Sequence, residues 1–292
     1  MKRRDFVTGC GAGLLATAAG AEGERRIEVC AFEKPLQGLS YDELAAALAK
    51  LGFDGVEATV RPGGHVLPER VEEDLPKMVE AMKKRGLAVT VMATAVNRAD
   101  DAVGVRVLKT AAALGVKRYR TGYYKYDLKK PVKAQLHEWR PVVNELAALN
   151  GELGLQGLYQ NHAGRNYVGA PIWDLDVLLD GVEPDELGVV WDLRHATAEG
   201  GMSWPLDWNV IRDRVRMLYA KDFVWEGAKL KNVPLGEGRT EGSFYTKLVK
   251  DGLTVPISLH VEYFDHKKVG RNVAPVLEAL GRDLNVLRGW LG

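Results

Sequence analysis

Short apolar stretches alternate eight times with helical patterns along this 292-residue sequence, and this alternation constrains its fold more than any other feature. The apolar stretches have the length and composition of buried parallel strands. We expect strands at residues 27–32, 55–60, 88–94, 117–122, 156–162, 187–193, 215–222 and 255–263. Helical patterns follow at residues 41–51, 72–85, 102–114, 132–153, 173–179, 208–212 (weakly marked), 243–251 and 273–291.

Glycines mark most of the expected helix ends. Gly52, Gly86, Gly115, Gly154 and Gly252 each stand one to three residues before the next strand, as helix C-caps do. Eight strand–helix units without a linker predict an α/β fold, a single (β/α)8 TIM barrel. An open doubly wound sheet is the alternative, and it is disfavoured because no Gly-rich phosphate loop follows an early strand.

The first 21 residues differ from the rest of the chain. Lys2, Arg3 and Arg4 precede a stretch rich in Gly, Ala and Leu, which ends in small residues at 19–21. This pattern is typical of an export signal, and the arginine pair resembles the twin-arginine type. A basic surface helix is the alternative, but Gly and Ala would bury little there. We expect a twin-arginine signal peptide at 1–21, a barrel domain at 22–292 and a periplasmic location.

The expected mature chain is close to neutral. Removing Lys2, Arg3, Arg4 and Asp5 lowers Lys plus Arg from 40 to 37 and Asp plus Glu from 39 to 38, a net charge of −1. Such a chain has no net positive charge that would attract nucleic acid electrostatically. Beyond the signal, no stretch is apolar enough to suggest a membrane span. Cleavage would also remove Cys10 and leave Cys30 as the single remaining cysteine, so no intramolecular disulfide is expected.

Polar side chains gather where the expected strands end, and in a barrel these positions surround one mouth, where the active site lies. They are Glu57, Arg61, His65, Thr94, Arg120, Tyr123, Tyr124, Gln160, Asn161, His162, Asp192, His195, Lys221, Asp222, His260 and Glu262. Carboxylate, imidazole and amide groups that converge suit a divalent cation, here Mn²⁺, Co²⁺, Zn²⁺ or Mg²⁺. No single spacing is diagnostic, since an isolated buried His is more often a core residue than a ligand.

Tryptophans are frequent in or near the loops after the sixth and seventh strands. The four are Trp191, Trp204, Trp208 and Trp225. Indole faces pack against the C–H surfaces of sugars, so this cluster favours a small-molecule sugar as partner. For any one of the four taken alone, loop packing is the better explanation.

At these strand ends, from about residue 27 to residue 291, the sequence resembles the xylose isomerase-like barrel superfamily, the sugar phosphate isomerase/epimerase group. The resemblance rests on residues 51–57, on 159–162, on Asp192-x-x-His195-Ala196, on Lys221-Asp222 with 234–238, and on 258–262. It implies a metal held by Glu, Asp, His and Glu after strands five to eight, with both Glu residues moving protons at adjacent sugar carbons. Those four positions are occupied here by Gln160, Asp192, Tyr219 and His260.

These departures from the family pattern alter the expected chemistry. An amide at Gln160 coordinates through its oxygen but cannot abstract a proton. We therefore expect a weak metal site on Gln160, Asp192 and His260. Glu262, on the same strand face as His260, is the first choice of base, and an imidazole at His162 or His260 is the alternative. Substrate contacts are expected from Glu57, Arg61, His65, Arg120, Tyr124, Asn161, His195, Lys221 and Trp225.

The sequence thus predicts an exported, metal-assisted enzyme that abstracts a proton next to the carbonyl of a sugar or keto-sugar. Isomerisation, epimerisation and elimination share this step, and the sequence does not choose among them. A non-catalytic or degenerate sugar-binding barrel is an alternative, because ligands of the family pattern are replaced. An endonuclease of the same superfamily is disfavoured, because it needs more His and carboxylate ligands and a basic face. The sequence leaves the substrate, the metal and the oligomeric state open.

Overall fold

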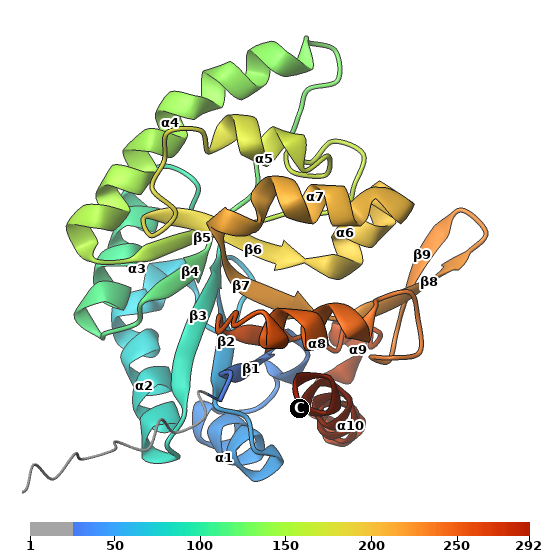
Figure 1. The fold of residues 1–292 in the computed structure, drawn as a ribbon. Coiled ribbons are helices and arrows are strands. Elements are labelled where there is room, and N and C mark those ends of the chain that lie inside the picture. Colours follow the sequence, from blue (N-terminus) through green and yellow to red (C-terminus); the bar gives the residue numbers. More distant parts are fainter. Residues whose placement is uncertain (1–25) are drawn as a thin grey trace, which may run out of the picture.

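The structure is a computed structural model that describes residues 26–292, and these residues form a closed barrel (Figure 1). Its parallel strands follow the spatial order β1-β10-β7-β6-β5-β4-β3-β2. Their bounds are β1 Val29–Phe32, β2 Gly55–Val60, β3 Ala88–Thr94, β4 Arg118–Arg120, β5 Gln156–Gln160, β6 Leu187–Asp192, β7 Val215–Ala220 and β10 Ile257–Leu259. Because β1 pairs with both β2 and β10, the sheet closes. The predicted single (β/α)8 TIM barrel is confirmed, and the doubly wound alternative is excluded.

Helices surround the barrel on its outer side (Figure 1). Their bounds are α1 Tyr41–Leu51, α2 Val71–Lys84, α3 Ala102–Ala113, α4 Val132–Leu153, α5 Trp173–Leu178, α6 Leu193–Gly200, α7 Trp204–Ile211, α8 Gly242–Lys250, α9 His266–Val269 and α10 Ala274–Leu291. Local signals in the sequence set the ends of α1. Ser40 and Glu43 form a capping box at its start, and Gly52 ends it with a left-handed φ of 86°. The predicted signal peptide at 1–21 lies outside the described residues and stays a prediction.

The apolar core has two parts, one on each side of the barrel wall. A small cluster fills the barrel interior, and it consists of Cys30, Val91, Leu158, Val190, Met217 and Tyr219. A larger cluster joins the outer faces of the strands to the helices, for example through Leu44 and Leu48 of α1 and Met78 of α2. These side chains are fully buried, and each such burial contributes about 1.5–3 kcal/mol. The interior packing closes the barrel below its carboxyl-end mouth, so it is no open pore.

The strand expected at 215–222 divides into two elements. Strand β7 ends at Ala220, and residues Asp222–Glu226 (β8) pair antiparallel with Lys229–Val233 (β9) in a hairpin that projects from the barrel (Figure 1). Asp222 organises this turn, because its carboxylate accepts backbone N–H groups at 2.8–3.0 Å, from Phe223, Gly236, Gly238 and Thr240. Asp222 therefore shapes the loop and does not join the barrel-mouth residues.

The region after β6 also differs from the expectation. Helix α6 starts directly after the strand, because the carboxylate of Asp192 accepts the backbone N–H of His195 and caps it. The weak helical pattern expected at 208–212 is the end of α7, which begins at Trp204. Periodicity missed α6 because its residues Leu193, Arg194, His195 and Ala196 are all buried, so the helix has no polar outer stripe there.

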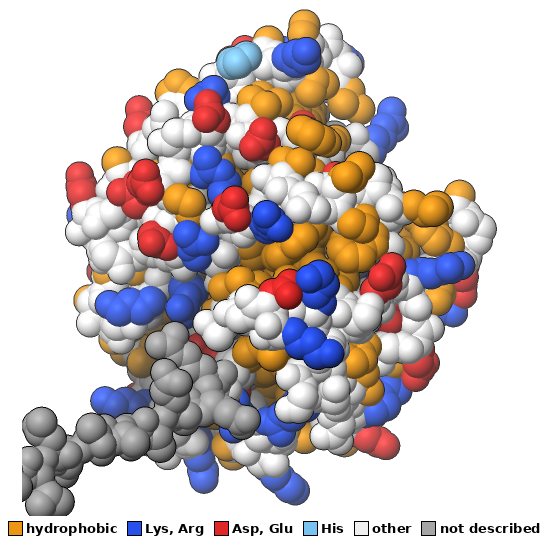
Figure 2. All heavy atoms as spheres, viewed as in Figure 1, with side chains coloured by type: hydrophobic (Ala, Val, Ile, Leu, Met, Phe, Trp, Pro, Cys, Tyr) orange, Lys and Arg blue, Asp and Glu red, His pale blue; other side chains and the backbone are white. Residues whose placement is uncertain are grey.

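Charged side chains of both signs are interspersed over the face in Figure 2, while apolar side chains gather over α5 and α7. Trp173, Met202 and Leu206 are exposed in this area. Across residues 26–292, none of the helices combines the length and apolar character that crossing a bilayer requires.

Candidate active site

Two adjoining cavities open at the carboxyl ends of the barrel strands. The inner cavity, of about 140 Å³, is lined by Phe32, Lys34, Glu57, Arg61, Arg120, Tyr123, Gln160, His162, Tyr219, Lys221, His260 and Glu262. The outer cavity, of about 370 Å³, is lined by Phe32, Lys34, Pro35, His162, Ala163, Arg194, His195, Asn232, Val261, Glu262, Phe264 and His266. Because Phe32, Lys34, His162 and Glu262 line both, the cavities form one cleft. It occupies the end of the barrel where enzymes of this architecture carry their active sites.

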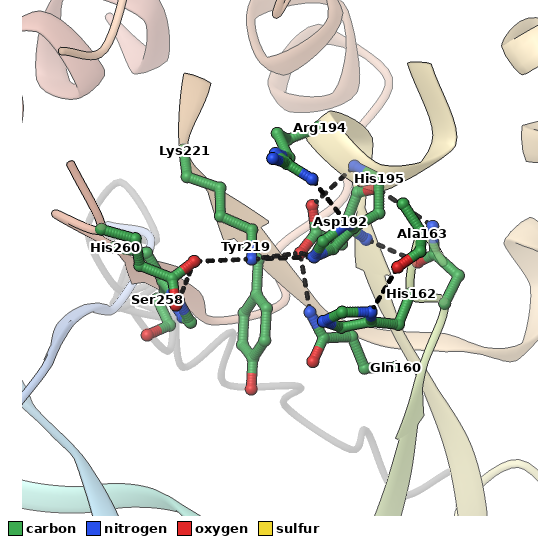
Figure 3. A network of polar contacts seen from close by, with 12 residues as sticks. Gln160, His162, Ala163, Asp192, Arg194, His195, Tyr219, Lys221, Ser258 and His260 are labelled. Carbon is green, nitrogen blue, oxygen red and sulfur yellow. Dashed lines mark hydrogen bonds and ion pairs between the residues drawn. The ribbon is translucent and has the colours of Figure 1, made fainter. Parts of the chain in front are cut away.

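The ammonium group of Lys221 lies at the centre of the polar network (Figure 3). Its Nζ is 2.9 Å from Asp192 Oδ2, 3.0 Å from Glu262 Oε2 and 3.1 Å from His195 Nε2. The residue is only 6% exposed. Burial disfavours the charge, but the carboxylates of Asp192 and Glu262 outweigh this effect and raise the pKa of Lys221. The lysine therefore carries a fixed positive charge at the floor of the cleft.

Asp192 is held in place from three sides. Its Oδ1 accepts the N–H of His195 at 3.0 Å, and its Oδ2 accepts the amide of Gln160 at 2.7 Å as well as the Lys221 ammonium. The side chain of Asn161 exchanges hydrogen bonds with the Asp192 backbone, at 3.0 Å to its carbonyl and 2.8 Å from its N–H. Asn161, which we expected to bind substrate, thus joins the end of β5 to the end of β6.

A second buried cluster centres on Glu57. Its carboxylate accepts hydrogen bonds from Tyr219 and Ser258, both at 2.5 Å, and lies 2.9 Å from His260 Nε2. Burial alone would raise the pKa of Glu57, but His260 and the two hydroxyls lower it, so the group is an ionised carboxylate. His260 stacks on Phe32 at 4.3 Å, and its buried Nδ1 has no hydrogen-bond partner within the described residues. This nitrogen lies 3.9 Å from Glu262 Oε2.

His162 lies on the opposite side of Lys221 from His260 (Figure 3). Its Nδ1 is 2.8 Å from the carbonyl oxygen of Ala163, and only an N–H can make that contact. The hydrogen bond therefore leaves Nε2 with a free lone pair. Burial, helped by the charge of Lys221, lowers the pKa of His162 to about 4, so the imidazole is neutral at physiological pH.

The residues expected to bind a metal do not fit a divalent cation as they are arranged. Both ends of the Gln160 amide are engaged, the nitrogen by Asp192 and the oxygen by the hydroxyl of Tyr123. Asp192 Oδ2 is shared with the Lys221 ammonium, and His260 Nε2 faces Glu57. In the described part of the chain, no group of three or more His, Cys, Asp or Glu side chains is placed to hold a metal ion. The point where the carboxylates converge is taken by the cation of Lys221.

Some residues expected at the site lie outside both cavities. His65 bridges Glu33 and the carbonyl of Leu39, at 3.1 Å and 3.0 Å, and Tyr124 stacks between Tyr159 and Trp139. These contacts tie loops to the barrel, which explains why polar residues occur there.

The tryptophans also differ from the expectation of a sugar-binding cluster. Trp225 is 45% exposed on the β8–β9 hairpin, and Trp191 is fully buried against Trp208. Trp204 and Trp208 both pack on Phe244. None of the four lines either cavity. Trp191, Trp204 and Trp208 thus serve packing between β6, α7 and α8, while Trp225 lies at the surface of the hairpin.

Sequence reasoning missed several residues of the cleft. The structure adds Phe32 at the end of β1, Lys34 just after it, Arg194 on α6, Asn232 on β9 and the segment around Phe264. Phe32 and Lys34 lie at the end of the first strand, so the strand-end rule that found the other residues applied to them as well. Asn232 had no such signal, because the hairpin brings it to the cleft, where its Oδ1 accepts from Arg194 at 2.8 Å.

A TIM barrel with a polar, ion-paired cleft at its carboxyl-end mouth defines the class of this protein. The chain matches the family described as Xylose isomerase-like TIM barrel over residues 45–290, and it belongs to that family. Among curated proteins, none matches the sequence.

Solved structures share the fold at low sequence identity. The chain is similar to the probable 3-DHS dehydratase involved in petrobactin synthesis from Bacillus anthracis, at 14% identity and a TM-score of 0.69, covering 90% of this chain and 99% of that one. It is similar to D-psicose 3-epimerase from Clostridium cellulolyticum H10, at 14% identity and a TM-score of 0.68, covering 91% and 99%. It is also similar to 3-keto-D-glucoside 4-epimerase from E. coli, at 14% identity and a TM-score of 0.60, covering 87% and 99%.

Proposed function

We propose that this protein is an enzyme that moves a proton on the carbon next to the carbonyl of a sugar or keto-sugar, in an isomerisation, epimerisation or elimination. The observation that carries the proposal is the Lys221 ammonium, fixed between Asp192 and Glu262 in a cavity that His162 and Glu262 also line. A cation that polarises a carbonyl and a base that takes the neighbouring proton are what this reaction requires. Relatives of the same fold bear the names of epimerases and a dehydratase, which agrees with this class of reaction.

Lys221 is assigned the role of the electrophile. When the α-proton leaves, negative charge develops on the carbonyl oxygen, and a preformed cation stabilises it without reorganisation. The two carboxylates hold the ammonium in place and keep it protonated. In this proposal the charge that a divalent cation would supply comes from the side chain, and a metal on Gln160, Asp192 and His260 would first have to displace Lys221.

Glu262 is assigned the role of the base. Its Oε2 holds Lys221, and the side chain remains 29% exposed toward the cleft. Burial would raise the pKa of Glu262, but Lys221 and His260 lower it, so the carboxylate is ionised at neutral pH. Because Glu262 Oε2 and Lys221 Nζ are 3.0 Å apart, a base and an electrophile at these positions could act on adjacent carbon and oxygen atoms of a substrate. His162, with its free Nε2, supplies a second proton acceptor across the cavity.

Proton exchange with solvent tests the proposal directly. Purified protein is incubated in D₂O with D-fructose, D-tagatose, a 3-keto-D-glucoside and D-fructose 6-phosphate, and deuterium at the carbon next to the carbonyl is followed by NMR. We expect exchange above the uncatalysed rate with at least one compound. Glu262→Gln should slow it by about 10²–10⁴-fold. Glu278→Gln, an exposed position on α10, is the matched control and should exchange like the parent.

Two results would count against the proposal. Undiminished exchange in Glu262→Gln would remove Glu262 from the role of base. Absence of exchange with every compound, in a protein that binds one of them, would favour the non-catalytic sugar-binding barrel.

A further inference from the structure

Three cations of the inner cavity have no carboxylate partner. Arg61 follows β2, Arg120 ends β4 and Lys34 lies in the short 3-10 turn after β1, and all three line this cavity. Within residues 26–292, none of them forms an ion pair, and the side chains of Arg61 and Lys34 make no hydrogen bond. Arg120 is 4% exposed, and its guanidinium donates one hydrogen bond, at 3.0 Å to the carbonyl of Thr121. The other N–H groups of Arg120 find no acceptor in the part of the chain that the structure describes.

The carboxylates of the cleft are already engaged elsewhere. Glu57 accepts from Tyr219, Ser258 and His260, while Asp192 and Glu262 hold Lys221. Among residues 26–292, no carboxylate therefore lies within ion-pair distance of Arg61 or Arg120 in this cavity. Aromatic faces are their neighbours instead, with Arg61 5.9 Å from the centre of Phe32 and Arg120 4.9 Å from that of Tyr123.

Two poorly solvated guanidinium groups close to each other are costly unless an anion joins them. Burial and the neighbouring Arg120 lower the pKa of Arg61. Burial acts in the same direction on Arg120, but Tyr123, Tyr219, Glu57 and Glu262 outweigh it and raise the pKa of Arg120, so Arg61 is the less compensated of the two cations. A guanidinium presents its N–H groups as a planar fork that matches carboxylate and phosphate oxygens in pairs. The two guanidinium groups in one cavity therefore have the chemistry of an oxyanion clamp.

We infer that Arg61 and Arg120, assisted by Lys34, bind an oxyanion group of the substrate, either a carboxylate or a phosphate. Resting on the proposed function, this narrows the substrate to an acidic or phosphorylated carbohydrate. The clamp and Lys221 line the same cavity of about 140 Å³, so the oxyanion and the reacting carbonyl lie only a few bonds apart. The larger outer cavity receives the remaining hydroxylated part of the molecule.

A matched set of three-carbon probes tests the clamp by calorimetry on the intact protein. Glycerate and glycerol 3-phosphate carry an oxyanion, and glycerol carries none. We expect at least one of the two acids to bind while glycerol shows no binding, and whichever acid binds identifies the oxyanion. Added salt should weaken the binding, because it rests on charge.

Variants then assign the contact to the two arginines. Arg61→Met and Arg120→Met should each weaken binding of the acid by about ten- to a hundredfold. Arg118→Met is the control, since Arg118 lies on the same strand as Arg120 but lines a surface pocket away from the cleft. If Arg120→Met fails to fold, Arg120→Lys keeps the charge without the fork and should still weaken binding.

The inference is overturned if glycerol binds as well as the acids, if neither acid binds, or if both arginine variants keep the parental affinity. It can fail separately from the proposed function. Solvent exchange confined to neutral sugars would leave the proposed function standing without the clamp. Binding of an acid that depends on Arg61 and Arg120, without exchange on any compound, would leave the clamp standing without the reaction.

Discussion

Lys221 Nζ lies 2.9 Å from Asp192 Oδ2, at the point where the sequence led us to expect a divalent cation. An ionised carboxylate that is buried is stable only with a positive charge beside it. The ammonium of a lysine side chain can supply this charge, as a metal ion can. Glu262 completes the pair from the other side at 3.0 Å. With Lys221 between Asp192 and Glu262, we expect the protein to respond differently from a metalloenzyme, both to a chelator and to loss of the lysine.

The first prediction concerns metal dependence. The parent protein, dialysed against a chelator, should keep its solvent-exchange activity, because Lys221 supplies the positive charge. Metal analysis of the purified protein and activity with and without added Mn²⁺ check this. Loss of activity on chelation, with recovery on adding Mn²⁺, would return the site to the expected ligands Gln160, Asp192 and His260.

The second prediction concerns the removal of the ammonium. Lys221→Met keeps most of the side-chain volume but leaves Asp192 and Glu262 without a counter-charge. We expect the free energy of unfolding to fall by about 3–5 kcal/mol, as when one partner of a buried ion pair is removed. Activity should drop by about 10²–10³-fold. Added Mn²⁺ should raise the melting temperature of this variant more than that of the parent, because two carboxylates now face each other.

The exposed pair of Lys247 and Asp251 provides the control for that experiment. Lys247→Met removes a lysine from a surface ion pair, which contributes about 0–1 kcal/mol. It should leave activity and the response to Mn²⁺ unchanged. A Lys221→Met protein as stable and as active as the parent would show that the ion pair has neither role.

The third prediction concerns Asn161, which holds the backbone of Asp192 through two hydrogen bonds. Asn161→Ala removes both hydrogen bonds to the buried backbone of Asp192, so stability should fall by about 1–3 kcal/mol. If Asn161 positions Asp192 and does not bind substrate, kcat should fall while KM changes little. Asn209→Ala, at an exposed position, serves as the control. A large rise in KM with unchanged stability would instead support the substrate contact expected from the sequence.

The fourth prediction is a dependence of stability on pH that arises from Asp174 in α5. Burial raises the pKa of Asp174 above its ordinary value, so the folded state holds this proton more tightly than the unfolded state. The resulting stabilisation is complete below the unfolded pKa, near 3.9, and is lost as pH rises through the folded pKa. Asp174→Asn should therefore gain stability relative to the parent as pH rises. Denaturant unfolding over this pH range measures the difference, and a constant difference would contradict the prediction.

The fifth prediction concerns export. We propose that residues 1–21 are a twin-arginine signal and that the mature chain begins near Glu22. Changing Arg3 and Arg4 together to Lys should block export while the folded domain stays intact, because the pair precedes the barrel domain in the sequence. N-terminal sequencing of the exported protein and fractionation of both forms check this. A parent chain that keeps Met1 and stays in the cytoplasm would contradict it.

The barrel could be predicted because the sequence signals for its strands and helices are local. Each strand and helix is encoded by its own periodicity, and caps such as Ser40 and Gly52 mark ends that depend on neighbouring residues only. The position of Asp192, Lys221 and Glu262 at the mouth followed from the same rule, since residues that end parallel strands share one edge of the sheet. The failures occurred where local pattern is ambiguous, as in α6, whose first turn is buried on all sides.

Which of the strand-end residues contact each other depends on how the barrel closes. Glu57 and His260 are 203 residues apart in the sequence, and they meet because β1 brings β2 and β10 to its two sides. Lys221 and Asp192 were both expected at the mouth, but the strand register between β6 and β7 and the turn made by Asp222 place the ammonium on the carboxylate. The sequence by itself determined that the side chains ending the strands, such as Asp192, Lys221 and Glu262, lie at the mouth, because strand ends are local features; it did not determine residues that a hairpin or helix brings to the cleft, such as Asn232 and Arg194. Only the tertiary structure decided which charges neutralise each other and which, like Arg61 and Arg120, remain free, because ion pairing depends on distances of a few ångströms between distant parts of the chain.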